Sequence, residues 1–113
     1  MKHVILFTVL TFFGLSAFAS EATDTVKVSG VCGSCKKRIE KAAMDAGAIS
    51  ANWSDTTQIL AVKYDDAKTT LLAIEKQIAS VGHDTRDVKA PDDVYMKLDE
   101  CCQYDRTTPA PAQ

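Results

Sequence analysis

The chain has 113 residues, of which 46% are hydrophobic and 25% are charged, and this is the composition of an ordinary globular domain. The length leaves room for one such domain. A net charge of −2 gives no electrostatic reason to bind nucleic acid or an anionic membrane surface, so we expect neither as a partner.

The first 19 residues have the pattern of a secretory signal peptide. A short basic start (residues 1–3) precedes an apolar run (residues 4–15), and Ala17 and Ala19 are the small residues that a signal peptidase accepts. The run is too short for a membrane-spanning helix, although an uncleaved anchor is the alternative. Cleavage near Ala19 would remove one basic residue, Lys2, and leave a charge of 12 − 15 = −3. We therefore expect a periplasmic or secreted protein.

After the leader, the sequence predicts a first strand at residues 25–28, where Val26 and Val28 share one face. A glycine-rich loop then leads into a helix from about 34 to 46. Its apolar residues recur at helical spacing, and the helix stops at Gly47.

Two further strands are expected at residues 49–53 and 58–64, and the short polar turn between them predicts a hairpin. A second amphipathic helix follows at 70–81 and ends at Gly82, and a weaker fourth strand is expected at 83–88. The order β-α-β-β-α-β is typical of the ferredoxin-like fold. This α+β architecture has a four-stranded antiparallel sheet with two helices on one face.

The remaining residues predict an extension and a tail beyond this unit. Pro91 suits the start of a short helix that reaches Leu98. The sequence therefore divides into a domain at residues 24–90, a C-terminal helical extension with a cysteine pair at 91–106, and a Thr/Pro/Ala-rich tail at 107–113 that we expect to be disordered.

Cys32 and Cys35 form a Cys-x-x-Cys motif at the junction of the glycine-rich loop and the first helix. This spacing brings both sulfurs close to the helix N-terminus. The unpaired amides, the helix dipole and the basic residues 36–38 favour thiolates there. Two soft sulfurs without a nearby carboxylate favour a soft metal ion, Cu(I) above all.

Cys101 and Cys102 bring the cysteine count to four, and disulfides between the two pairs remain open because export implies an oxidising compartment. Disulfides within each pair would close almost no loop. Adjacent cysteines cannot form a relaxed disulfide. The pair could instead extend the metal site, bind a second ion, form a strained redox pair or be buried as small apolar residues.

Several stretches match one family in order and spacing. They are VSGVCGSC at 28–35, KRIEKA at 37–42, LAVKY at 60–64 and IASVGH at 78–83. With them, the region from Thr25 to about Lys89 resembles the heavy-metal-associated domain, the family of copper chaperones, periplasmic mercury-binding proteins and N-terminal modules of metal ATPases. The resemblance implies a metal ion carried by Cys32 and Cys35, which occupy the family's ligand positions.

Two residues depart from the family pattern. Gly30 stands where the family usually has a Met that supports the metal loop from the core. His83 follows Gly82 where many members have Tyr, and the resemblance places it beside the metal loop, as an accessory ligand or as a surface residue. Cys101 and Cys102 are further accessory candidates, and the two motif cysteines with His83 and one of this pair would suit Zn²⁺.

These features predict a metal-binding protein and not an enzyme, since no Ser-His-Asp pattern or phosphate-cradling loop is present. We expect it to capture Cu(I), or alternatively Hg²⁺ or Zn²⁺, and to transfer or sequester the ion. The expected partners are the metal ion and a membrane metal transporter or other metal-accepting protein. We expect a monomer, with a metal-bridged dimer as the alternative.

A second hypothesis is a periplasmic thiol–disulfide oxidoreductase, because export, the Cys-x-x-Cys motif and nearby positive charge also fit that class. Against it, the chain lacks a thioredoxin-like order of elements and a Pro between the cysteines. A third hypothesis is a scaffold whose four thiols are oxidised.

Overall fold

The structure is a computed structural model that describes residues 20–106. The expected signal peptide (1–19) and the expected tail (107–113) lie outside the described residues. In chain order the elements are β1 (Glu21–Lys27), α1 (Gly33–Asp45), β2 (Ala48–Trp53), β3 (Ile59–Asp65), α2 (Leu71–Ser80), α3 (Asp92–Met96) and the 3₁₀ helix η1 (Glu100–Cys102). Within residues 20–106, every helix is too short or too polar to cross a membrane.

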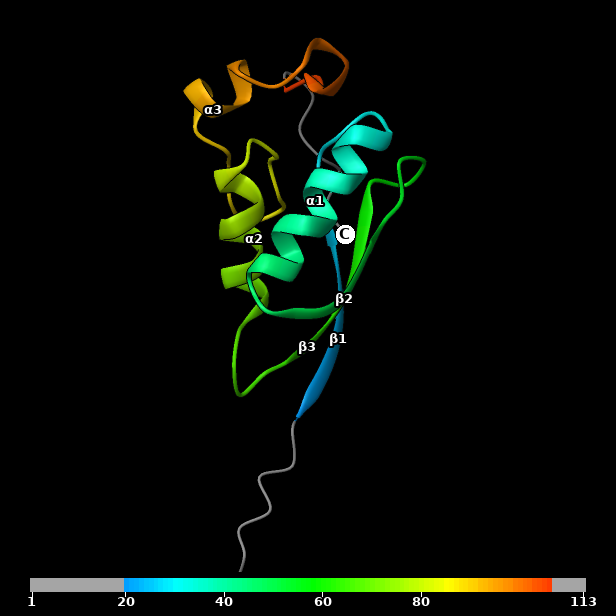
Figure 1. Cartoon of the computed structure of the whole chain (residues 1–113), viewed down its shortest axis with the longest axis vertical. Helices are drawn as coiled ribbons and strands as arrows, with labels where there is room; N and C mark the ends of the chain where they lie inside the picture. Colours follow the sequence, from blue (N-terminus) through cyan, green and yellow to red (C-terminus); the bar gives the residue numbers. More distant parts are fainter. Residues whose placement is uncertain (1–19, 107–113) are drawn as a thin grey trace, which may run out of the picture.

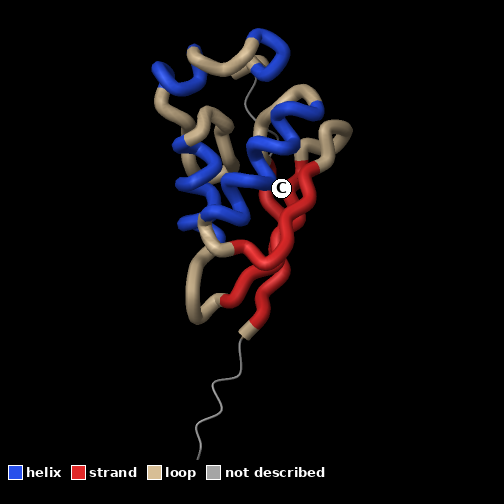
Figure 2. The backbone as a smooth tube through the Cα atoms, viewed as in Figure 1, coloured by secondary structure: helices blue, strands red, loops and turns tan. Residues whose placement is uncertain are grey.

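The strands form one antiparallel sheet in the order β1-β3-β2, with α1 and α2 on one side of it (Figures 1 and 2). Alternate residues of β3 face the helices, so Leu60, Val62 and Tyr64 are buried while Ala61 is exposed. The expected α+β architecture with two helices on one face is therefore confirmed.

The fourth strand, expected at residues 83–88, is reduced to a single bridge between Val28 and Thr85 in the described structure. The Thr85 amide donates to the Val88 carbonyl oxygen over 2.8 Å, and the Thr85 hydroxyl accepts from the Val88 amide over 3.1 Å. Such local side-chain bonds compete with a strand ladder. The chain consequently turns at this point, and the described sheet has three strands.

The core lies between the sheet and the two long helices. The apolar stripe predicted for α1 is buried at Ile39, Ala42 and Ala43. At the end of β2, Trp53 is 1% exposed, and its indole N–H donates to the Val28 carbonyl oxygen over 2.9 Å. Trp53 thereby links β2 to the residue that follows β1.

Residues 91–106, which we call the C-terminal strap, cross near the N-terminal end of α1 (Figure 1). The Tyr104 hydroxyl donates to the Gly82 carbonyl oxygen and accepts from the Asp84 amide, both over 2.8 Å. Arg106 forms an ion pair with Asp84 at 2.7 Å. The strap is thus fastened to the turn that follows α2.

Candidate metal centre

Cys32 and Cys35 lie together at the start of α1. Cys32 is the N-cap residue, with an extended backbone (φ −136°, ψ 179°), and Cys35 lies in the first turn. Their Sγ atoms are 3.6 Å apart. No side chain of residues 20–106 caps this helix by a hydrogen bond, which leaves its positive end to the two sulfurs.

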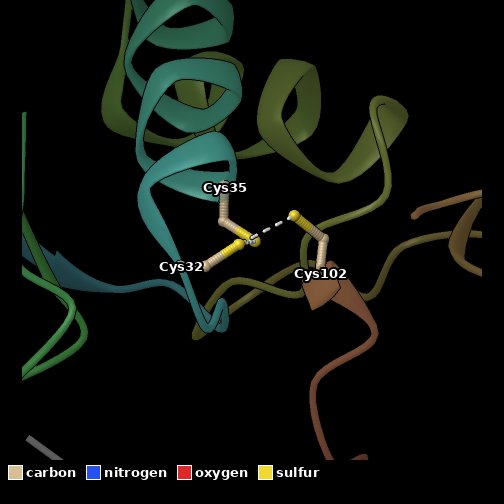
Figure 3. A group of neighbouring side chains, drawn as sticks. All are labelled: Cys32, Cys35 and Cys102. Atoms are coloured by element: carbon tan, nitrogen blue, oxygen red, sulfur yellow. Dashed lines mark hydrogen bonds between the residues drawn. The ribbon is translucent and has the colours of Figure 1, made fainter. Parts of the chain in front are cut away.

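A third sulfur joins them from the strap. Cys102 Sγ lies 3.4 Å from Cys32 Sγ, and the three sulfur atoms are all within 4.8 Å of one another (Figure 3). In the part of the chain that the structure describes, these cysteines form the one group of His, Cys, Asp or Glu side chains placed to hold a metal ion. The donor set is therefore entirely sulfur.

The Ser34 hydroxyl lies between the motif and the strap. Its Oγ is 3.0 Å from both Cys32 Sγ and Cys102 Sγ, and 3.7 Å from Cys101 Sγ. A hydroxyl carries one hydrogen, so it donates to one of these sulfurs at a time. The sequence analysis did not single out Ser34, whose hydroxyl the structure places beside three of the four cysteines.

The two motif cysteines differ in acidity. The Ser34 hydroxyl, the Cys35 backbone and Cys102 together lower the pKa of Cys32 to about 6. Burial raises the pKa of Cys35, which is 0% exposed, to about 12. Within the motif, the partly accessible Cys32 is therefore the more acidic thiol, and an ion that binds both sulfurs must displace the proton of Cys35.

Lys36, one of the basic residues expected to favour the thiolates, has other partners. Its ammonium donates to Glu40 Oε2 over 2.6 Å, to Asn52 Oδ1 over 2.8 Å and to the Trp53 carbonyl oxygen over 2.9 Å. Hydrogen bonds at the helix start, rather than this ammonium, account for the acidity of Cys32.

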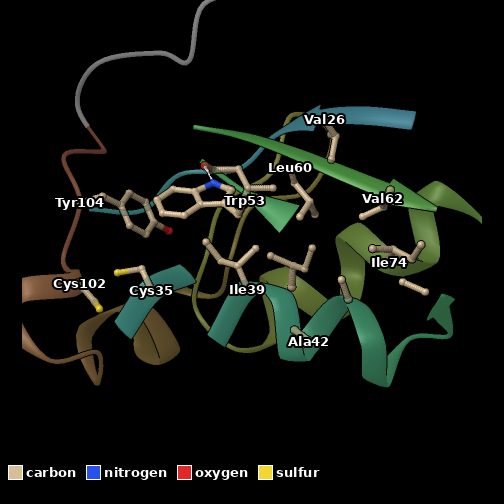
Figure 4. Packing of buried hydrophobic residues seen from close by; sticks show 14 of the residues in the cluster. Val26, Cys35, Ile39, Ala42, Trp53, Leu60, Val62, Ile74, Cys102 and Tyr104 are labelled. Carbon is tan, nitrogen blue, oxygen red and sulfur yellow. Dashed lines mark hydrogen bonds between the residues drawn. The ribbon is translucent and has the colours of Figure 1, made fainter. Parts of the chain in front are cut away.

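The ring of Trp53 lies against Gly30 in the loop that joins β1 to α1 (residues 28–32), which we call the metal loop. A Cβ atom added at Gly30 would lie 2.9 Å from two carbons of the Trp53 ring and 3.2 Å from Cys35 Cβ. Figure 4 shows the indole beside Cys35, at the end of the core that carries the cysteines. The Gln58 amide also donates to the Gly30 carbonyl oxygen over 2.7 Å. The indole occupies the space beside residue 30, so a side chain there would have to displace the ring or the loop. The absence of the family's Met at this position was the signal in the sequence that another residue fills that space.

His83 lies outside the three-sulfur group and is fully buried. Its Nδ1–H donates to the Ser29 carbonyl oxygen over 2.8 Å, and its ring stacks on Tyr104 with centroids 5.7 Å apart. Burial lowers the pKa of His83, which favours the neutral form of the ring. Its Nε2 has no hydrogen-bond partner among residues 20–106. In this structure His83 joins the loop before the motif to the strap.

Cys101, the remaining accessory candidate, is exposed, whereas its neighbour Cys102 is 0% exposed. The strap therefore turns one cysteine of the pair inward, toward the motif, and the other outward. All four cysteines are free thiols in the structure.

Comparison with known proteins matches residues 25–84, more than half of the chain, to the model of the heavy-metal-associated domain. A comparison with curated proteins gives no match.

Several solved structures are similar. A CopZ metallochaperone has 29% identity and a TM-score of 0.54, over 57% of this chain and 98% of its own. Oxidised MerP from Ralstonia metallidurans CH34 has 28% identity and a TM-score of 0.55, over 58% of this chain and 94% of its own. The water-soluble region of the P-type ATPase CopA from Bacillus subtilis has 31% identity and a TM-score of 0.55, over 60% of this chain and 46% of its own. The chain belongs to the heavy-metal-associated domain family.

Proposed function

We propose that this protein captures Cu(I) outside the cytoplasm through Cys32 and Cys35, and that it transfers or sequesters the ion. The observation that carries the proposal is the pair of sulfurs 3.6 Å apart at the uncapped start of α1. Sulfur ligands without oxygen or imidazole favour soft ions such as Cu(I) and Hg²⁺ over harder ions. Export rests on the leader pattern of residues 1–19.

Transfer would proceed by ligand exchange, in which thiolates of an acceptor replace the two cysteines in turn. Of the two motif sulfurs, Cys32 is the accessible one, and it would bind and be exchanged before Cys35. The proposed acceptor is a membrane metal transporter or another metal-binding protein. The likeness to a metallochaperone and to a P-type ATPase region supports this choice.

An anaerobic Cu(I) competition titration of the mature protein tests the proposal. We expect Cys32→Ser and Cys35→Ser each to weaken binding by more than the roughly 10- to 100-fold that loss of an outer-shell partner costs. Cys101→Ser, which removes an exposed thiol, is the matched control and should bind as the unaltered protein does. Binding that survives both motif substitutions unchanged would eliminate the function. Parallel titrations with Hg²⁺ and Zn²⁺ establish the preference among ions.

Thiol–disulfide exchange is the second candidate function, and the difference in acidity within the motif favours it. An accessible thiolate at Cys32 beside the protonated, buried Cys35 is the arrangement of an attacking and a resolving thiol. The metal-free dithiol should then reduce insulin, and Cys32→Ser should abolish that activity. A metal-free protein that leaves insulin oxidised excludes this candidate.

A further inference from the structure

We propose that Cys102 is a third ligand of the metal ion, so that the strap completes a three-sulfur site and must move away before the ion leaves. This inference rests on the proposed function, because it adds a ligand to the same site. Residue 102 lies beyond the matched domain (25–84).

The geometry fits a three-coordinate ion. Metal–thiolate bonds of about 2.3 Å in a planar arrangement place the sulfurs about 4 Å apart. In the structure the Sγ separations are 3.6 Å for Cys32–Cys35 and 3.4 Å for Cys32–Cys102, with all three atoms within 4.8 Å of one another. A slight expansion of the group would therefore admit an ion between the three sulfurs.

Buried cysteine is often a small apolar residue, and Cys102 does border the core. Its sulfur, however, lies 3.0 Å from the Ser34 hydroxyl and 3.4 Å from Cys32 Sγ, so the atom faces the polar start of α1. Figure 3 shows Cys102 reaching toward the two motif cysteines from the opposite side. This orientation distinguishes a ligand from a packing residue.

The strap holds Cys102 in place by contacts remote from the sulfurs. The Cys102 amide donates to the Asp99 carbonyl oxygen over 2.7 Å, which closes the turn of η1. Arg106 donates to Asp84 and to the Ala90 carbonyl oxygen, each over 2.7 Å, and the Tyr104 hydroxyl bonds to the turn after α2. These bonds prepare the third ligand before an ion arrives, and such preorganisation strengthens binding.

A third thiolate on the strap affects how the metal ion is released. When the strap opens, the Cys102 sulfur leaves the ion on the two motif sulfurs, and an acceptor thiolate can then take the vacated third position. With the strap closed, the ion is held by three sulfurs, of which two belong to residues that are 0% exposed. The strap therefore favours retention, and its opening controls transfer.

Cu(I) X-ray absorption combined with competition titration tests the inference. We expect sulfur neighbours from all three cysteines in the unaltered protein and in Cys101→Ser, the matched control. Cys102→Ser should lose one sulfur neighbour and bind about tenfold or more weakly. Unchanged coordination and affinity in Cys102→Ser would overturn the third ligand while leaving the proposed function intact. The proposed function itself fails in the separate event that Cys32→Ser and Cys35→Ser bind normally.

A second variant keeps every thiol. Tyr104→Phe removes the hydroxyl that bonds to Gly82 and Asp84, and so loosens the strap. Loss of one or two hydrogen bonds should speed Cu(I) release to a chelator by roughly five- to thirtyfold, with the sulfur coordination number unchanged. A release rate equal to that of the unaltered protein would overturn the role of the strap.

Discussion

Replacing Gly30 with alanine tests whether Trp53 determines which residue the metal loop can accept. The new methyl would lie 2.9 Å from Trp53 Cζ2 and Cη2 and 3.2 Å from Cys35 Cβ, so the ring or the loop must move. Overpacking of this kind costs about 1–3 kcal/mol. A less flexible unfolded chain returns about 0.4–1 kcal/mol. We expect the free energy of unfolding to fall by about 1–2 kcal/mol.

A double-mutant cycle measured by urea unfolding isolates this contact. Trp53→Phe removes both ring carbons that the methyl would meet, so Gly30→Ala should cost at least about 1 kcal/mol less in that background. Gly33→Ala is the matched control, because a methyl there meets nothing within 4 Å. A Gly30→Ala penalty that is the same with and without the indole would refute the reasoning.

Three further predictions concern the site and the strap. Ser34→Ala should move the pKa of Cys32 up from about 6 toward that of an ordinary thiol, measured as the pH midpoint of alkylation of the metal-free protein; an unmoved midpoint would contradict the assigned hydrogen bond. Arg106→Gln should lower stability by about 2 kcal/mol at neutral pH. Burial raises the pKa of Asp84, but the hydrogen bonds from Arg106 lower it by more, so the folded pKa lies below its ordinary value. The stability that the Asp84–Arg106 pair contributes is therefore present above the unfolded pKa of about 3.9 and is lost as the pH falls through the folded pKa. Urea unfolding should therefore separate the two proteins more at pH 7 than in acid, where the bond from Arg106 to the Ala90 carbonyl oxygen remains. A deficit of the same size at both pH values would contradict the contribution of Asp84. Gly82→Ala should destabilise by about 1–3 kcal/mol in the same assay, because residue 82 has φ +110° and its Cβ would lie 2.9 Å from Leu98; a neutral effect would mean that this turn adapts.

Local patterns in the sequence predicted most of the fold. The stripe of Ile39, Ala42 and Ala43 predicted α1, and two of the glycines, Gly47 and Gly82, follow the ends of α1 and α2. The strand predicted at residues 83–88 is reduced to a single bridge because Thr85 forms local hydrogen bonds with Val88. The alternation of residue types in the sequence does not reveal such bonds.

The candidate site could be predicted in part. Cys32 and Cys35 are three residues apart, so one helix turn brings their sulfurs together, and the spacing in the sequence is enough to predict this contact. Cys102 meets Cys32 across 70 residues, through a strap whose course depends on Tyr104 and Arg106. No local pattern specifies a contact of that kind, and the sequence therefore left Cys101 and Cys102 equivalent.

Trp53 also gives the protein a built-in optical reporter. It is the single tryptophan of the chain, and its indole lies under Gly30 and beside Cys35. Intrinsic fluorescence excited through this ring therefore originates next to the thiols. Loading, oxidation or distortion of the metal loop should be readable from the emission of the native protein, without attaching a dye near the cysteines.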